Sequence, residues 1–160
     1  MRLELIHPVL VHFPIALLSI GTLLRLAAFF TAKKPRLSFL LPAATLILLL
    51  GVISAWIAII FGEIAKDIVE STIKNISILR EHEEHAYLTA YGFTLALAID
   101  WGRRFLINKR KHKGWMVNRG LAVFIWFFYF FGFVNLLVAG FFGGELVYEE
   151  GAAIHRNYDK

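Results

Sequence analysis

The sequence His-Pro-Val-Leu-Val-His-Phe-Pro occupies residues 7–14 and opens an apolar run that continues to Phe30. A run of about 20 apolar residues is long enough to cross a bilayer as a helix. Pro8 suits the first helical position, whereas Pro14 removes a helical hydrogen bond and loosens the backbone beside His12. Polar side chains at this depth cost free energy unless something satisfies them. We therefore expect the histidines of this stretch to bind something.

The composition is that of an integral membrane protein. Of the 160 residues, 58% are hydrophobic, the mean hydropathy is +0.64, and the apolar residues are clustered in runs. The absence of cysteine excludes disulfides, iron–sulfur clusters, thiolate metal sites and the covalent attachment of c-type haem. The net charge of +5 comes from basic residues placed between the apolar runs, where they set membrane orientation. We therefore do not expect binding to nucleic acid.

Four apolar segments predict membrane-spanning helices near residues 9–30, 39–62, 85–107 and 120–142. The third carries polar residues and Asp100, so it is amphipathic and should be shielded by the other three. No linker, low-complexity tract or repeat is evident in the chain. The sequence therefore predicts one domain over residues 1–160, an all-α membrane four-helix bundle.

The charges of the connections predict the orientation of the bundle. The connections 31–38 and 108–119 are rich in Lys and Arg, which places them in the cytoplasm by the positive-inside rule. The connection 63–84 has three basic residues against six acidic ones, and its spaced isoleucines favour helix extending from the membrane. Both termini then lie on the periplasmic side of a bacterial cytoplasmic (inner) membrane.

This topology gathers polar side chains on the periplasmic side. Five of the six histidines fall there: His7, His12, His82, His85 and His155. Glu63 ends the second predicted span on the same side. Because three separate connections contribute groups that can bind a ligand, this side is the candidate functional site.

We interpret the site as one for a single, non-covalent haem b. Neutral imidazoles from two helices commonly hold b-type haem in a helical bundle. His12 and His85 are the preferred axial ligands because each is the deeper histidine of its helix. Ala16 follows His12, and Gly92 follows His85, at spacings that leave a slot for a flat ring. His7 and His82 complete the candidate ligands, and the haem propionates could pair with one of four cations: Arg80, Lys66, Arg2 or Arg156.

Two other interpretations remain open. Copper, zinc or iron could be bound as a divalent ion by His7, His82 and Glu63. Alternatively, the histidines are interfacial and the chain is a non-catalytic accessory subunit of a respiratory complex. The sequence His-Glu-Glu-His at residues 82–85 has its histidines three apart, whereas a zinc protease needs four, so we do not expect a protease. Asp100 should pair with Arg103 or Arg104 at helical spacing.

Three motifs resemble the bacterial membrane family called domain of unknown function 2231. They are His-Pro-x-x-Val-His-Phe-Pro at residues 7–14, His-Ala at 85–86, and Gly-Gly-x-Leu-Val-Tyr-x-x-Gly at 143–151. The resemblance covers nearly the whole chain and implies four membrane helices, with His7, His12 and His85 at family-type positions. The chain departs from the family pattern at Glu63, where an aspartate is expected, and at Thr89, where an asparagine is expected.

Some members of that family are fused to Rieske or cytochrome c modules, so the resemblance implies a redox partner. The resemblance implies no particular reaction. Because of the histidines on one side and the small residues beside them, we expect electron transfer between a quinone or partner subunit and a periplasmic carrier, in place of a stand-alone enzyme activity. The chain could act alone, as an oligomer or within a larger membrane complex. Asn135, deep in the fourth span, is expected to form a hydrogen bond between helices.

Overall fold

The computed structural model describes the backbone of residues 5–109 and 115–152, and the side chains of residues 5–105 and 119–152. These residues form an all-α fold. Its helices are α1 (Ile6–Leu10), α2 (His12–Phe30), α3 (Leu40–Val69), α4 (Ile76–Lys109) and α5 (Trp115–Tyr148), with short 3-10 helices η2 (Pro35–Leu37) and η3 (Glu70–Thr72). Because α1 continues almost directly into α2, the chain forms four long helical rods, which confirms the predicted all-α four-helix architecture.

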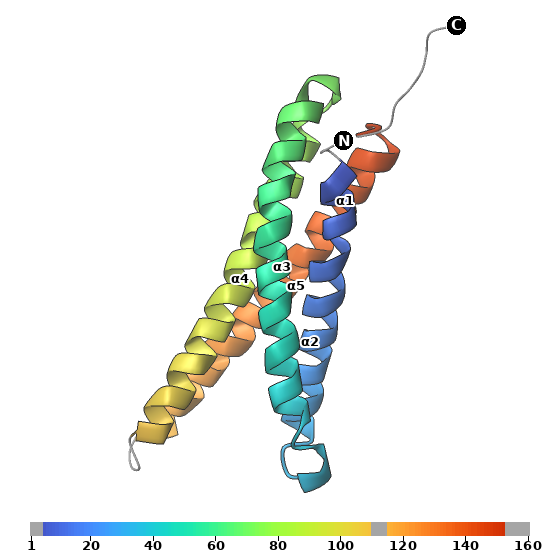
Figure 1. Ribbon diagram of the computed structural model, residues 1–160. Coiled ribbons are helices and arrows are strands. Elements are labelled where there is room, and N and C mark those ends of the chain that lie inside the picture. Colours follow the sequence, from blue (N-terminus) through green and yellow to red (C-terminus); the bar gives the residue numbers. More distant parts are fainter. Residues whose placement is uncertain (1–4, 110–114, 153–160) are drawn as a thin grey trace, which may run out of the picture.

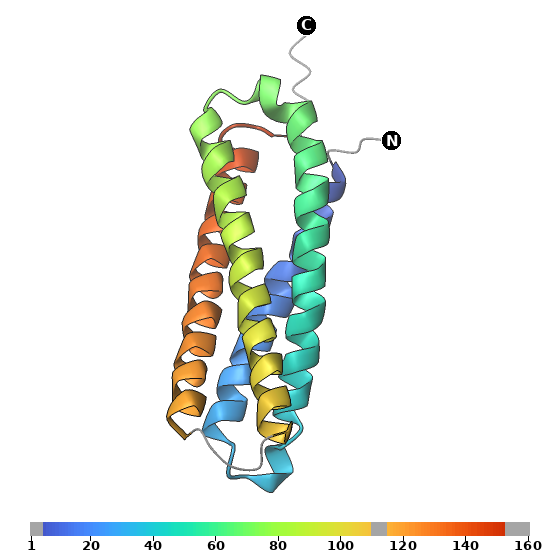
Figure 2. The same ribbon diagram turned by 90° about the vertical axis from the view of Figure 1, so that its left-hand side faces the viewer.

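The four rods are arranged as two hairpins (Figures 1 and 2). In the first hairpin α2 packs on α3, and in the second α4 packs on α5; contacts between the hairpins are far fewer. The start of α1, the η3 connection and the end of α5 lie together at one end, which we call the histidine end. The connection between α2 and α3 lies at the opposite end of the bundle.

Glycines allow the helices of each hairpin to pack closely. A Cβ atom added to Gly51 of α3 would lie 2.7 Å from Leu18 Cδ2 of α2. A Cβ atom added to Gly132 of α5 would lie 2.8 Å from Phe93 Cδ2 of α4. Leu18 and Phe93 are completely buried in the same hydrophobic core. Since membrane helices associate largely through close packing, these glycines set the two hairpin interfaces.

Two local expectations are confirmed. The helix is interrupted at Val11, between α1 and α2, because Pro14 has no N–H to donate to the Leu10 carbonyl, although Val11 itself keeps helical φ and ψ. The connection 63–84 is mostly helical, because α3 continues to Val69 and α4 already begins at Ile76. These extensions carry the polar residues of the connection beyond the predicted spans.

Three segments of the described chain are long and apolar enough to cross a membrane: Ile6–Phe30, Pro35–Thr72 and Arg119–Tyr148. They contain three of the four predicted spans. The helix α4 is long enough but not apolar enough to be among these segments, because the predicted span 85–107 includes Asp100 and several other polar residues. Its central residues are nevertheless buried among the other helices, Ala90, Phe93 and Ala96 completely. This agrees with the expectation that the third span is shielded.

Candidate cofactor site

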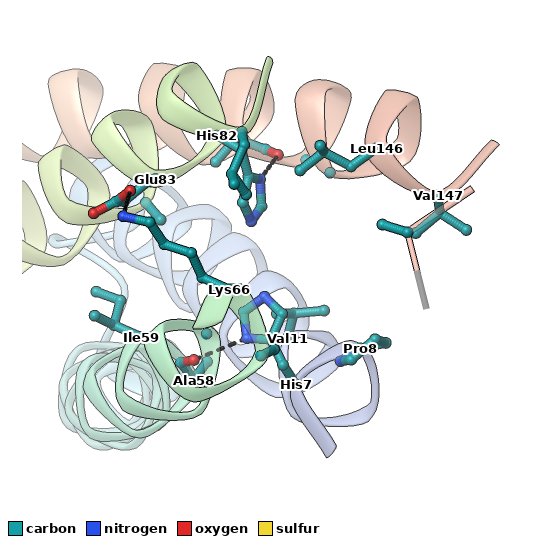
Figure 3. A pocket seen from close by; sticks show the side chains of 18 of the residues that line it. His7, Pro8, Val11, Ala58, Ile59, Lys66, His82, Glu83, Leu146 and Val147 are labelled. Carbon is teal, nitrogen blue, oxygen red and sulfur yellow. Dashed lines mark hydrogen bonds and ion pairs between the residues drawn. The ribbon is translucent and has the colours of Figure 1, made fainter. Parts of the chain in front are cut away.

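A cavity of about 460 Å³ lies at the histidine end, between the two hairpins (Figure 3). Its wall is mainly apolar and is contributed by all four rods. Small residues such as Ala58, Gly62, Ala139 and Gly143 line it, which explains why space remains between the helices. A cavity of this size with few polar groups is typical of a binding site for a small molecule or cofactor.

His7 enters the cavity from α1 and is held by α3. Its Nδ1 lies 2.9 Å from the carbonyl oxygen of Ala58. A carbonyl oxygen can only accept, so Nδ1 donates its hydrogen and the lone pair of the neutral ring is on Nε2. A Cβ atom on Gly62 would lie 3.0 Å from His7 Cε1, so the imidazole packs directly on this glycine. Backbone and glycine together fix the position of the ring.

His82 enters the cavity from α4 and is held by α5 in the same way. Its Nδ1 donates to the carbonyl oxygen of Ala139 at 2.9 Å, and a Cβ atom on Gly143 would lie 3.1 Å from His82 Cε1. Because the carbonyl oxygen can only accept, Nδ1 carries the hydrogen and the lone pair of the neutral ring is on Nε2.

The two imidazoles face one another across the cavity. Their ring centroids are 6.0 Å apart, and their planes are nearly perpendicular, at 84°. In Figure 3 the second nitrogen of each ring points towards the other ring. Neither Nε2 forms a hydrogen bond to any residue that the structure describes. The arrangement therefore presents two nitrogen lone pairs to the space between them.

Polar side chains form one wall of the cavity. Lys66 Nζ of α3 lies 2.6 Å from Glu83 Oε2 of α4, and the hydroxyl of Tyr87 donates to Glu63 Oε1 at 3.2 Å. All four of these residues line the cavity. Both contacts join α3 to α4, so they connect the two hairpins beside the histidines.

The preferred ligands of the sequence analysis occupy different positions. His12 is exposed at the edge of the cavity. His85 is not among the residues that line the cavity. Its Nδ1 lies 2.6 Å from Asn135 Oδ1 of α5, and its ring stacks on Phe142. The structure therefore brings together His7 and His82, while His85 confirms the interhelical hydrogen bond expected for Asn135.

The other candidate residues do not extend the cavity down the bundle. A Cβ atom on Gly92 would lie 3.0 Å from Gly132 Cα, so α4 and α5 leave no slot there, and Ala16 is exposed. Arg80 is exposed and lies away from the cavity wall. Within the described residues, no group of three or more His, Asp or Glu side chains could hold a metal ion. The sequence candidates His155, Arg2 and Arg156 lie outside the described residues.

A buried ion pair near the opposite end was not predicted. Arg25 Nη2 of α2 lies 2.8 Å from Asp100 Oδ1 of α4, and the two side chains are only 9% and 3% exposed. Arg104 Nη2 lies 2.9 Å from the other carboxylate oxygen of Asp100, which confirms one of the two expected partners. Arg25 also lies over the ring of buried Tyr129, with its Cζ 5.7 Å from the ring centroid.

Comparison with known proteins places the chain in a family. The model of the family described as "Predicted membrane protein (DUF2231)" matches residues 4–156, which is almost the entire chain. No curated protein and no solved structure matches it. The match includes the cavity, both facing histidines and the ion pair of Arg25 and Asp100. The chain therefore belongs to the DUF2231 family of predicted membrane proteins.

Proposed function

We propose that the protein is a membrane b-type haem protein that transfers electrons, with His7 and His82 as the haem ligands. The facing pair of imidazoles is the observation that carries this proposal. Two metal–imidazole bonds of about 2.0 Å, with roughly 1 Å from each bonded nitrogen to its ring centre, separate the ring centres by about 6 Å. The centroid distance of 6.0 Å agrees with that requirement.

The hydrogen bonds of the two rings also suit this function. Imidazoles that bind a metal usually donate their other N–H to a carbonyl or carboxylate, which fixes the tautomer and the ring orientation. The carbonyls of Ala58 and Ala139 accept such bonds here. Bound between these rings, the iron of a haem would alternate between its ferrous and ferric states and so pass one electron at a time. The apolar wall would exclude water from the haem. Lys66 would pair with a carboxylate of the haem in place of its present partner, Glu83.

The metal-ion alternative has less support. Two imidazoles satisfy the axial positions of haem iron, whereas a zinc or copper site needs at least one more ligand from the protein. Glu63 lines the same cavity, but it accepts a hydrogen bond from Tyr87 and forms no metal-binding cluster with His7 and His82 among the described residues.

We further propose that α4 is the fourth membrane span and that the histidine end faces the periplasm of a bacterial cytoplasmic membrane. The basic residues Lys33, Lys34 and Arg36 connect α2 to α3 at the opposite end, as the positive-inside rule requires of a cytoplasmic loop. Burial of α4 against α5 supports its insertion despite its polar residues. The electron partners would then be a quinone in the bilayer and a periplasmic carrier of the cytochrome c or Rieske type.

An optical spectrum of the protein, expressed with ample haem and purified in detergent, tests the proposal. We expect a reduced-minus-oxidised difference spectrum of the b type that is altered in each of the single variants His7→Ala and His82→Ala and lost in the double variant His7→Ala/His82→Ala. His12→Ala and His85→Ala are the matched controls and should keep it. A colourless wild-type protein, or loss of haem only in the two controls, would show the proposal to be wrong; metal analysis of such a protein would then test for a bound ion.

A further inference from the structure

The second helices of the two hairpins share one pattern of residues. In α3, Gly51 packs on Leu18, the carbonyl of Ala58 holds a histidine, and Gly62 lies against the ring of that histidine. In α5 the same three roles belong to Gly132, Ala139 and Gly143. Both triplets have spacings of seven and four residues, and each α5 residue follows its α3 counterpart by 81 positions.

The first helices of the hairpins match as well. Leu18 follows His7 by 11 residues, and Phe93 follows His82 by 11 residues. Each is completely buried and each contacts the matching glycine of its hairpin. Eighteen residues after each histidine comes a buried charged residue, Arg25 in α2 and Asp100 in α4. The two hairpins are therefore equivalent units joined in one chain.

Equivalent residues also meet each other between the hairpins. His7 faces His82, and Arg25 pairs with Asp100 near the other end of the bundle. In a two-fold arrangement, only residues close to the axis contact their own counterparts. Two such contacts, separated by 18 residues of helix or about 27 Å, indicate an approximate two-fold axis that runs along the bundle and through the cavity.

We propose that the cofactor site lies on this approximate two-fold axis, so that His7 and His82 are equivalent ligands that fill both axial positions of a single iron. This inference rests on the proposed function and narrows it. With both axial positions occupied by the protein, the site carries electrons and has no open position for oxygen, carbon monoxide or another small ligand. The site is thereby assigned to electron transfer, as opposed to the binding or activation of a gas.

Carbon monoxide, added to the reduced holoprotein in detergent, tests the inference. We expect the wild-type spectrum to stay unchanged, whereas His7→Gly and His82→Gly should each bind carbon monoxide with similar affinity. Added imidazole should restore the wild-type spectrum in both variants, since each would leave a space of the same shape on one side of the iron. Binding of carbon monoxide by the wild-type holoprotein, or by only one of the two variants, would overturn the inference while leaving the proposed function in place.

Electron paramagnetic resonance of the oxidised wild-type protein gives a second measurement that does not depend on the variants. Two imidazoles with planes 84° apart should give a strongly anisotropic low-spin ferric signal, because perpendicular axial rings leave the iron orbitals nearly degenerate. A high-spin ferric signal would reveal an open axial position and overturn the inference. Absence of haem from the wild-type protein would overturn the proposed function and this inference together.

Discussion

Replacing Asp100 by asparagine should destabilise the protein far more than replacing Arg104, its exposed partner, by glutamine. Asp100→Asn leaves the guanidinium of Arg25 buried, with 9% of its side chain exposed, and without a counter-ion. Removing one partner of a buried pair typically costs about 3–5 kcal/mol. We expect about 3 kcal/mol, since the amide still accepts a hydrogen bond. Arg104 is 41% exposed, so Arg104→Gln should cost at most about 1 kcal/mol.

The free energy of unfolding can be measured by titrating the protein from mild detergent into a denaturing detergent while following helical circular dichroism. The double variant Arg25→Met/Asp100→Leu is the decisive control, because it removes both charges together. Exchange of a buried ion pair for apolar residues is often neutral, so this variant should lie within about 1 kcal/mol of wild type. The reasoning is refuted if Asp100→Asn costs no more than Arg104→Gln, or if the double variant is as unstable as Asp100→Asn.

Three further outcomes follow from single contacts. Gly143→Val should displace the ring of His82, 3.1 Å from the added Cβ, and weaken haem binding; Gly120→Ala, whose Cβ meets nothing within 4 Å and which lies outside the cavity, should leave the spectrum unchanged. Asn135→Leu should cost about 1 kcal/mol in the free energy of unfolding, yet retain the haem spectrum, because its hydrogen bond lies outside the cavity. Lys66→Gln should cost at most about 1 kcal/mol in the same titration, since its ion pair is partly exposed; a larger loss of stability would contradict this.

The helices were predictable because long apolar runs in a chain without cysteine have few alternatives to membrane helices. That Asn135 forms a hydrogen bond between helices and that Asp100 contacts Arg104 were also predictable, the first from the depth of a polar residue in an apolar span and the second from helical spacing. Such predictions need only the depth or the local spacing of a residue.

The choice between neighbouring histidines required the packing of the helices. His82 and His85 are three residues apart and lie on nearby faces of α4. Contact with α5 turns His85 towards Asn135 and leaves His82 in the cavity. Likewise, the hydrogen bond to the Ala58 carbonyl holds His7 in the cavity, whereas His12 is exposed at its edge. The depth of a histidine in the membrane could not by itself show which member of each pair lies in the cavity.

The repeat was missed because the hairpins share spacing and small residues but few identical side chains. Its counterparts differ as widely as Leu18 and Phe93, or Arg25 and Asp100. A search for glycine, alanine and glycine at spacings of seven and four residues would have found both copies, at residues 51–62 and 132–143. Glycine and alanine are common in membrane helices, so the two copies can be recognised as a repeat only once their contacts with His7 and His82 are known.

The division of the cavity wall between two hairpins has a thermodynamic consequence. A ligand that bridges His7 and His82 adds its binding free energy to the association of the hairpins, whereas the packing inside each hairpin is independent of it. Removing such a ligand should therefore accelerate amide hydrogen exchange mainly where Lys66 and Glu83 join the two units, and much less where Leu18 packs on α3. The contact between the hairpins thus links occupancy of the cavity to the cohesion of the whole bundle.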